Sequence, residues 1–138
     1  MLSPAIDSEG APFWRYAAQG ELRVQACADC GRLRFPPRPC CPHCQSFASE
    51  WRRVGGHGRV WSYVVPHPPL LAGYAEQAPY NVVVVELAED PRIRLVGNLV
   101  ASADSALDSF PPAKVRIGAG VQVVFGSDGL PRWVLERP

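Results

Sequence analysis

The sequence contains no long hydrophobic run, and its longest purely apolar stretch is the four residues 82–85. A membrane-spanning helix needs about 20 apolar residues, so the sequence predicts no such helix. The N-terminus also lacks the basic residues and the apolar core of a signal peptide. We therefore expect a cytoplasmic protein.

An excess of charge of one sign is also missing. The net charge is +1 over 138 residues, and only one of the 14 basic residues is a lysine. Residues 1–60 hold eight arginines and five acidic residues, whereas residues 61–138 hold six basic and eight acidic residues. This distribution gives no strong electrostatic case for nucleic acid. The arginines suit bidentate contacts with phosphate or carboxylate, although a GC-rich genome would produce the same bias.

Motifs that mark common enzymes are missing. The sequence has no nucleophile motif, no Walker loop and no dinucleotide-binding fingerprint. Gly55-Gly-His-Gly58 precedes a predicted strand rather than a helix, so we interpret it as a flexible link. His67 lies in a proline-rich loop and could be a general base, but its motif holds no acidic residue to orient it. Packing of His67 against a partner is the favoured alternative, and no complete active site is predicted.

Cysteine, by contrast, is frequent. Four of the five cysteines form two Cys-x-x-Cys pairs separated by ten residues: Cys27 with Cys30, and Cys41 with Cys44. A reducing compartment argues against disulfides, and this spacing lets four thiolates complete a tetrahedron around one zinc ion. Because cysteine fills all four positions, we predict a structural zinc site, with Gly31 relieving the turn after the first pair.

The remaining candidate ligands are less favoured. An iron–sulfur cluster uses the same ligand type, but its usual spacings differ. Cys40 would break the two-residue spacing as a ligand, so we interpret it as a bystander. His43 and His57 are not needed once four thiolates are present, and we expect both at the surface.

The fifteen prolines and twelve glycines favour short strands and turns. We predict a mainly β chain with three parts: a helical segment at 1–20, a rubredoxin-like zinc ribbon at 21–54 and an OB-fold barrel at 55–138. The predicted helix spans residues 8–20, can be capped by Ser8 or Gly10, and carries more aromatic surface than a short helix can leave exposed.

Five strands are predicted for the barrel. They are expected at residues 59–65, 80–87, 92–100, 121–125 and 132–135, with the second strand buried on both faces and 102–120 forming a loop. Five strands with two long connections fit a small Greek-key barrel of the OB type.

An ordered set of motifs covers nearly the whole chain. The set comprises Pro12-Phe-Trp14, Gly20-Glu-Leu22, Cys27-x-x-Cys-Gly31, Phe35-Pro-Pro-Arg38, Cys41-Pro-x-Cys44, Gly58-Arg-Val60 followed by Ser62, Val65-Pro-His67-Pro68, Pro79-Tyr80, Val85-Glu-Leu87 and Ile117-Gly118. With these motifs the sequence resembles the OB-fold, zinc-ribbon, acyl-CoA-associated proteins, long catalogued as a domain of unknown function. Cys40 and the serine-rich 102–112 loop depart from the pattern of that family.

The resemblance implies an accessory subunit rather than an enzyme in its own right. Such proteins bind a thiolase-like acyltransferase or an aldolase in a hetero-oligomer and help to form its acyl-CoA channel. The partner makes or breaks C–C bonds of CoA thioesters in lipid, steroid or aromatic metabolism. Acyl-CoA would then be a ligand shared by the two subunits.

The resemblance also suggests roles for two sets of side chains. The predicted partner-facing residues are Phe13, Trp14, Tyr16, His67, Tyr74 and Tyr80. The predicted ligands for the CoA phosphates are Arg32, Arg34 and Arg38, since arginine pairs with phosphate bidentately. Only Arg38 belongs to a quoted motif, and solvated ribbon arginines are the alternative.

A zinc ribbon with an OB barrel is also compatible with a single-stranded nucleic-acid or protein interaction module. The predicted barrel is net acidic and lacks interleaved basic and aromatic residues, which disfavours nucleic acid. A third alternative is an enzyme that uses His67.

Overall fold

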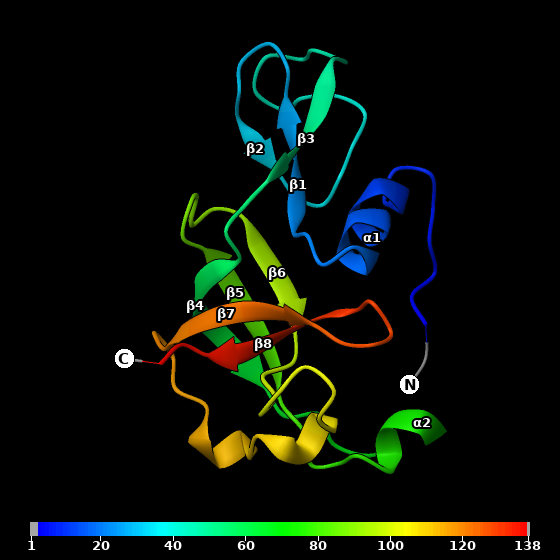
Figure 1. Cartoon of the computed structure of the whole chain (residues 1–138), viewed down its shortest axis with the longest axis vertical. Helices are drawn as coiled ribbons and strands as arrows, with labels where there is room; N and C mark the ends of the chain where they lie inside the picture. Colours follow the sequence, from blue (N-terminus) through cyan, green and yellow to red (C-terminus); the bar gives the residue numbers. More distant parts are fainter. Residues whose placement is uncertain (1–2, 138) are drawn as a thin grey trace.

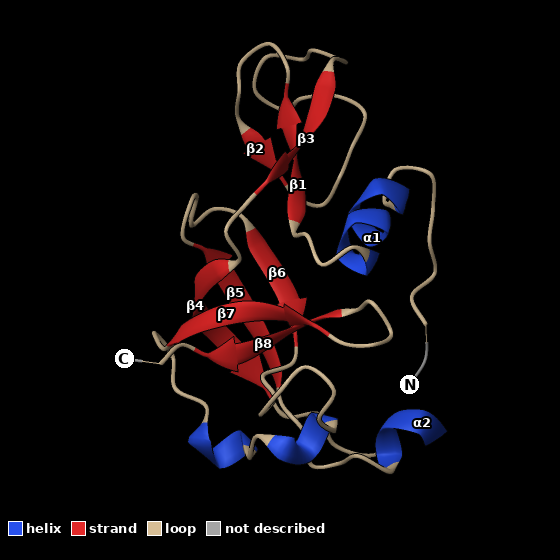
Figure 2. Cartoon of the chain, in the orientation of Figure 1, coloured by secondary structure: helices blue, strands red, loops and turns tan. Residues whose placement is uncertain are grey.

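The computed structural model describes residues 3–137 as two sheets stacked along the long axis of the molecule, with helix α1 beside their junction (Figures 1 and 2). Helix α1 spans Ala11–Ala18 and has Pro12 in its first turn. Its N-cap is Gly10, whose backbone N–H donates to Asp7 Oδ1 at 2.6 Å. The predicted helix is therefore present but shorter. None of the described helices is long and apolar enough to cross a membrane.

The smaller sheet has three antiparallel strands. They are β1 (Arg23–Cys27), β2 (Leu33–Arg34) and β3 (Ser49–Arg53), in the order β2-β1-β3. Strand β1 lies in the middle, pairs with both neighbours and buries Val24 and Ala26 completely. The two cysteine pairs lie in the turns at the far end of this sheet, which is the architecture of a zinc ribbon.

The larger sheet contains the five strands of the predicted barrel. They are β4 (His57–Val64), β5 (Val82–Leu87), β6 (Arg94–Gly97), β7 (Gly120–Phe125) and β8 (Pro131–Leu135), in the order β6-β5-β4-β7-β8. The two edges meet through a parallel bridge between Leu99 and Trp133, and the N–H of Val100 donates to the Trp133 carbonyl at 2.8 Å. This closure confirms the OB-type barrel.

The connections contain short helical turns. Helix α2 (Ala72–Ala75) lies in the connection between β4 and β5. Two 3₁₀ turns, η1 (Leu107–Ser109) and η2 (Pro112–Lys114), lie between β6 and β7, where the sequence predicted an irregular loop. Figure 2 shows these turns at the end of the barrel opposite the ribbon.

Two strand predictions need correction. Strand β5 alternates between buried and half-buried positions, so it is not buried on both faces. The reason is that it pairs with β4 and β6 in an antiparallel sheet, in which one face packs on the core and the other is only partly covered. The third strand ends at Gly97 rather than at residue 100, because residues 98–100 turn away from β5 to close the barrel against β8.

Asn81 holds this closure together. Its side chain is fully buried, and its amide nitrogen donates to the Leu99 carbonyl at 2.8 Å and to the Phe110 carbonyl at 3.3 Å. The backbone N–H of Leu99 donates to Asn81 Oδ1 at 2.7 Å. One amide side chain therefore ties β5 to the 98–100 segment and to the 3₁₀ region.

One hydrophobic core runs through all three predicted segments. It contains Phe13 from α1, Leu22 and Val24 from the ribbon, and Val60 and Trp133 among its barrel members. Helix α1 and the ribbon thus bury apolar area against the barrel, which stabilises elements too small to fold alone.

Candidate metal centre and binding surfaces

The four predicted zinc ligands converge at the far end of the ribbon. Cys27 ends β1, and Cys30, Cys41 and Cys44 lie in the following turns, with all four sulfur atoms within 4.8 Å of one another. The Sγ atoms of Cys27 and Cys44 are 3.4 Å apart, and those of Cys30 and Cys41 are 3.7 Å apart. Four thiolates at about 2.3 Å from a tetrahedral zinc ion have sulfur–sulfur distances of about 3.8 Å. The arrangement fits this ion.

The two cysteine turns have the same backbone design. The N–H of Gly31 donates to the Cys27 carbonyl at 3.0 Å, and the N–H of Gln45 donates to the Cys41 carbonyl at 2.9 Å. Gly31 and Gln45 both have a positive φ, 78° and 64°. Glycine adopts this conformation without strain, which agrees with the predicted role of Gly31. Gln45 adopts the same left-handed conformation in the second turn although, unlike glycine, it carries a Cβ atom.

The thiol pKa values show why a cation suits this cluster. The backbone N–H of Cys30 is the largest cause that lowers the pKa of Cys27 to about 6, and the N–H of Cys44 lowers the pKa of Cys41. The N–H of Ser46 lowers the pKa of Cys44, but the Cys27 thiol, burial and the other thiols outweigh it and raise this pKa to about 12. Four thiolates this close repel one another, and a bound divalent cation offsets this repulsion and stabilises the deprotonated thiols.

Cys40 lies outside the cluster. Its Sγ donates to the Cys41 carbonyl at 3.6 Å, and it is not among the four thiols that converge. Among residues 3–137, no second group of three or more cysteine, histidine, aspartate or glutamate side chains has metal-binding spacing. His43 is exposed, and its Nδ1 lies 2.7 Å from Arg32 Nη1.

The three ribbon arginines occupy different environments. Arg32 and Arg38 are exposed, whereas Arg34 is only 4% exposed. Arg34 Nε donates to Gln25 Oε1 at 2.9 Å, and its Nη2 donates to the Arg38 carbonyl at 2.9 Å. Arg34, predicted as a ligand for the CoA phosphates, is therefore not an exposed side chain, and two of its nitrogen atoms hold the 35–38 loop in place.

The aromatic side chains of α1 face mainly inward. Phe13 is buried, and its ring packs against Trp14 and Phe35 with centroid distances of 4.9 and 5.5 Å. Tyr16 is half-buried beneath the guanidinium of Arg23, whose Cζ lies 4.4 Å from the ring centroid. Phe13 is hence removed from the predicted partner interface, because it packs in this chain's own core.

The long β4–β5 connection holds the other predicted interface residues. His67 is exposed and Tyr74 is half-buried, but Tyr80 is buried and packs against Tyr74 at a centroid distance of 6.0 Å. The prediction for Tyr80 is corrected, since its ring covers Val100 and Leu107 in a second small core.

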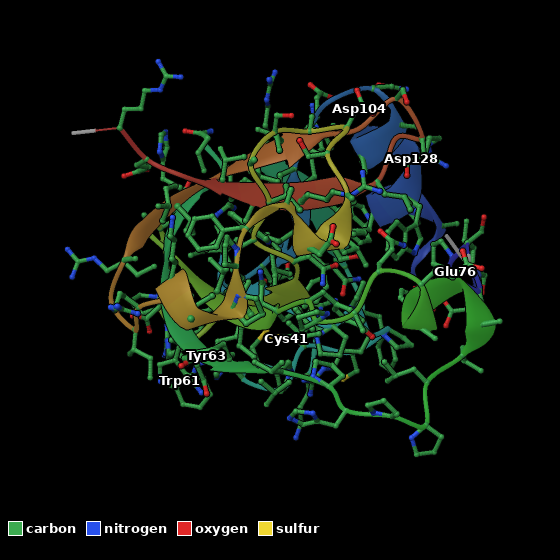
Figure 3. The ribbon with its side chains drawn as sticks, turned by 90° about the horizontal axis from the view of Figure 1, so that it is seen from below. Cys41, Trp61, Tyr63, Glu76, Asp104 and Asp128 are labelled. Atoms are coloured by element: carbon green, nitrogen blue, oxygen red, sulfur yellow. The ribbon has the colours of Figure 1, made fainter. Side chains whose placement is uncertain are left out.

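Four exposed apolar residues lie on β4 and in the connection that follows it, and sequence reasoning missed the three on β4. Trp61, Tyr63 and Val64 follow one another on β4, and Leu71 precedes α2. Figure 3 shows Trp61 and Tyr63 at one edge of the barrel. We call these four residues the β4 surface. Trp61 and Tyr63 lie in the strand predicted at residues 59–65, and nothing in the sequence pattern of that strand marked them as exposed.

An apolar cavity of about 440 Å³ lies between α1, the ribbon loop and the barrel. Phe13, Trp14, Phe35 and Trp133 line it among other apolar residues, and Arg94 is the one charged lining residue. The Arg94 guanidinium stacks on Trp61, with Cζ 3.8 Å from the ring centroid. This volume falls in the range of small-molecule sites, which are mostly apolar with a few polar groups.

Three acidic residues of the barrel, Asp104, Asp128 and Glu136, have structural partners. Asp128 accepts hydrogen bonds from Arg132, which lowers the pKa of its carboxyl group, and Asp104 accepts the backbone N–H of Ser127, which lowers its pKa (Figure 3). The carboxylate of Glu136 lies 2.5 Å from His57 Nδ1 at the surface. Among the described residues, no hydrogen bond or ion pair joins His67 to an acidic side chain.

Two family models together cover most of the chain. Residues 14–50 match the model described as "ChsH2, rubredoxin-like zinc ribbon domain", and residues 51–126 match "ChsH2, C-terminal OB-fold domain". The chain belongs to the ChsH2 family. This membership confirms the resemblance drawn from the motifs. The zinc-ribbon match and the four converging thiols together support a structural zinc in this ChsH2-family chain.

Similar proteins include two hydratase subunits. The chain is 42% identical over 118 residues to a "Probable enoyl-CoA hydratase alpha subunit" of Thermomonospora curvata, covering 86% of this chain and 33% of that protein. It is 34% identical over 125 residues to the "3-oxo-4,17-pregnadiene-20-carboxyl-CoA hydratase alpha subunit" of Mycobacterium tuberculosis, covering 91% and 36%. The chain thus spans about a third of the length of these relatives.

Other ChsH2-like proteins match over nearly their full length. A "DUF35 domain-containing scaffold protein" of Methanothermobacter thermautotrophicus is 32% identical over 131 residues, covering 89% of this chain and 90% of that protein. The solved structure "Ltp2-ChsH2(DUF35) aldolase" superposes with a TM-score of 0.81 at 37% identity, covering 96% of this chain and 98% of the matched chain.

Proposed function

We propose that this chain is a non-catalytic accessory subunit that binds a thiolase-like acyltransferase or an aldolase and helps to form its acyl-CoA channel. The observation that carries the proposal is the match over nearly the full length of both chains to the ChsH2(DUF35) chain of an aldolase. The hydratase subunits named for CoA thioesters point to the same substrate class. The partner performs the chemistry, and this chain contributes surface and stability.

The apolar cavity supports the shared-ligand part of the proposal. A cavity of about 440 Å³ walled by aromatic and proline side chains suits the acyl or pantetheine part of a CoA thioester. Arg94 at this cavity would favour a carbonyl or phosphate oxygen near its mouth. The two subunits would then enclose the ligand between them.

The β4 surface supports the docking part. Its four apolar side chains are exposed in this chain: three lie on β4, and Leu71 lies in the β4–β5 connection, which also holds the half-buried Tyr74. Exposed aromatic residues are enriched in interface cores, where they bury large areas at small entropic cost. We assign the partner contact to this surface, together with His67 and Tyr74.

Substitution of Leu71 tests the docking surface without threatening the fold. Leu71 is 64% exposed and occupies the N-cap of α2, where aspartate is a favoured residue. Leu71→Asp is therefore expected to fold normally but to weaken partner binding at least tenfold, because it places a charge in an apolar contact. The measurement is size-exclusion co-elution and titration with a candidate thiolase-like or aldolase partner.

Phe47→Asp is the matched control, since Phe47 is also apolar and is 78% exposed but lies in the ribbon. It is expected to bind the partner as the unsubstituted chain does. Equal binding by the Leu71→Asp chain would rule out the β4 surface as the docking site, and separate elution of the unsubstituted chain would rule out the complex.

A further inference from the structure

Arg34 is a buried charge without an acidic partner. Its guanidinium makes three hydrogen bonds to neutral acceptors: Nε donates to Gln25 Oε1 and to the Arg38 carbonyl, and Nη2 donates to the same carbonyl. Its Nη1 is buried and has no hydrogen-bond partner. Among residues 3–137, no carboxylate pairs with Arg34. A buried arginine is normally paired, since an uncompensated buried charge destabilises a fold.

A small cavity lies against this charge, where the ribbon meets the turn between β5 and β6. Its volume is about 220 Å³, and its charged or titratable lining residues are Arg34, Arg38, His43, Asp90 and Arg92. In Figure 1 the turn between β5 and β6 points towards β2, which carries Arg34. The cavity therefore belongs to the ribbon–barrel junction rather than to either part alone.

The charges around this cavity do not balance. Asp90 is the one carboxylate in its lining, and both of its oxygens accept hydrogen bonds from Arg92, at 3.1 Å each. Within residues 3–137, no carboxylate forms an ion pair with Arg34 or with the exposed Arg38 side chain, so the lining holds three guanidinium groups and one carboxylate. The excess of two positive charges equals the charge of a phosphate monoester, which is about −1.5 to −2 at pH 7.

We infer that this cavity binds a phosphoryl dianion. Arg38 and Arg92 supply guanidinium groups at the surface, and Arg34 supplies a fixed positive charge from behind the 35–38 loop. Arginine binds phosphate bidentately through its planar guanidinium, whereas a lysine ammonium acts only as a point charge. A volume of about 220 Å³ is below that of sites for whole drug-sized ligands, so the cavity takes a phosphoryl group and leaves the rest of its molecule outside.

The phosphoryl group has two possible sources: the 3′-phosphate of CoA, or free phosphate. Phe35 lines both this cavity and the large apolar cavity, with Pro36 and Pro37 on the apolar side and Arg38 on the charged side. One loop thus separates a site for the thioester arm from a site for a phosphate. The CoA source, unlike the anion site itself, rests on the proposed function.

The test is isothermal titration calorimetry on the full zinc-loaded chain at low salt, with inorganic phosphate, CoA and dephospho-CoA, which lacks the 3′-phosphate. Arg38→Gln and Arg92→Gln change exposed side chains, so both variants keep the backbone contacts of the loop and the turn. Each is expected to weaken phosphate binding about tenfold, because each removes a charged hydrogen-bonding group. Arg59→Gln, which removes an exposed arginine of β4, is expected to change it less than twofold.

The ligands separate the two sources. At least tenfold tighter binding of CoA than of dephospho-CoA, lost in Arg38→Gln, would identify the 3′-phosphate; equal binding of these two, with phosphate binding intact, would identify free phosphate. Absence of binding by both phosphate and CoA, or equal affinity in all three variants, would overturn the inference. Co-elution with the partner needs no phosphate, so that result would leave the proposed function standing.

Discussion

Cys27→Ser is expected to abolish zinc binding and to unfold the ribbon. The Cys27 sulfur is buried at the end of the central strand β1, and it is the thiol whose pKa is lowered to about 6. A structural zinc ion contributes about 10–16 kcal/mol of folding free energy to small domains, which is comparable to the entire stability of a typical domain, about 5–15 kcal/mol. The three-stranded ribbon has only Val24, Ala26 and a few neighbours to replace it.

Metal analysis and hydrogen exchange measure this effect. The unsubstituted chain should carry about one zinc ion per molecule, and Cys27→Ser should carry almost none and lose amide protection throughout residues 21–54. Cys40→Ser is the control, because Cys40 lies outside the cluster and its loss should leave both readouts unchanged. A Cys27→Ser chain that kept its zinc and its protected ribbon would refute the assignment of these ligands.

Asn81→Leu is expected to lower the free energy of unfolding by about 2–6 kcal/mol, because it leaves the N–H and the carbonyl of Leu99 buried without partners. The volume change is small, so the loss reports the hydrogen bonds rather than a cavity. Urea unfolding in excess zinc, followed by tryptophan fluorescence, measures the change.

Asn98→Ala is the comparison for this prediction. The Asn98 side chain donates one hydrogen bond, at 2.6 Å, to the backbone carbonyl of Asn81. Its loss should cost about 1 kcal/mol. If both variants were destabilised equally, or if Asn81→Leu lost less than about 1 kcal/mol, barrel closure would not depend on the buried amide.

The zinc ribbon and the barrel were predictable because their signals are local. Two Cys-x-x-Cys turns specify a tetrahedral site within a few residues each, and the β-branched run at 82–85 specifies a strand. The limits of that strand were not local. In the sequence, Asn81 is an ordinary polar residue before the β-branched run. Only its hydrogen bonds to Leu99 and Phe110, which are distant in sequence, show that its side chain is buried and links these segments.

The candidate site was predicted less completely for the same reason. Arg34 looks like the solvated arginines on either side of it, and only the ribbon fold brings Gln25 and the Arg38 carbonyl to its guanidinium. Phe13 and Tyr80 were assigned to a partner because their rings need cover, but the chain supplies that cover itself. Trp61 and Tyr63 show the reverse, since they are exposed on a strand for which no partner contact was predicted.

The central claim is that this chain assists an acyl-CoA enzyme without being one. The most direct measurement is the turnover of a CoA thioester by this chain alone, by its co-eluting thiolase-like or aldolase partner alone, and by an equimolar mixture. The account predicts no turnover by this chain alone and at least tenfold faster turnover by the mixture than by the partner alone. Turnover by the isolated chain, or a partner whose rate is unchanged by it, would contradict the account.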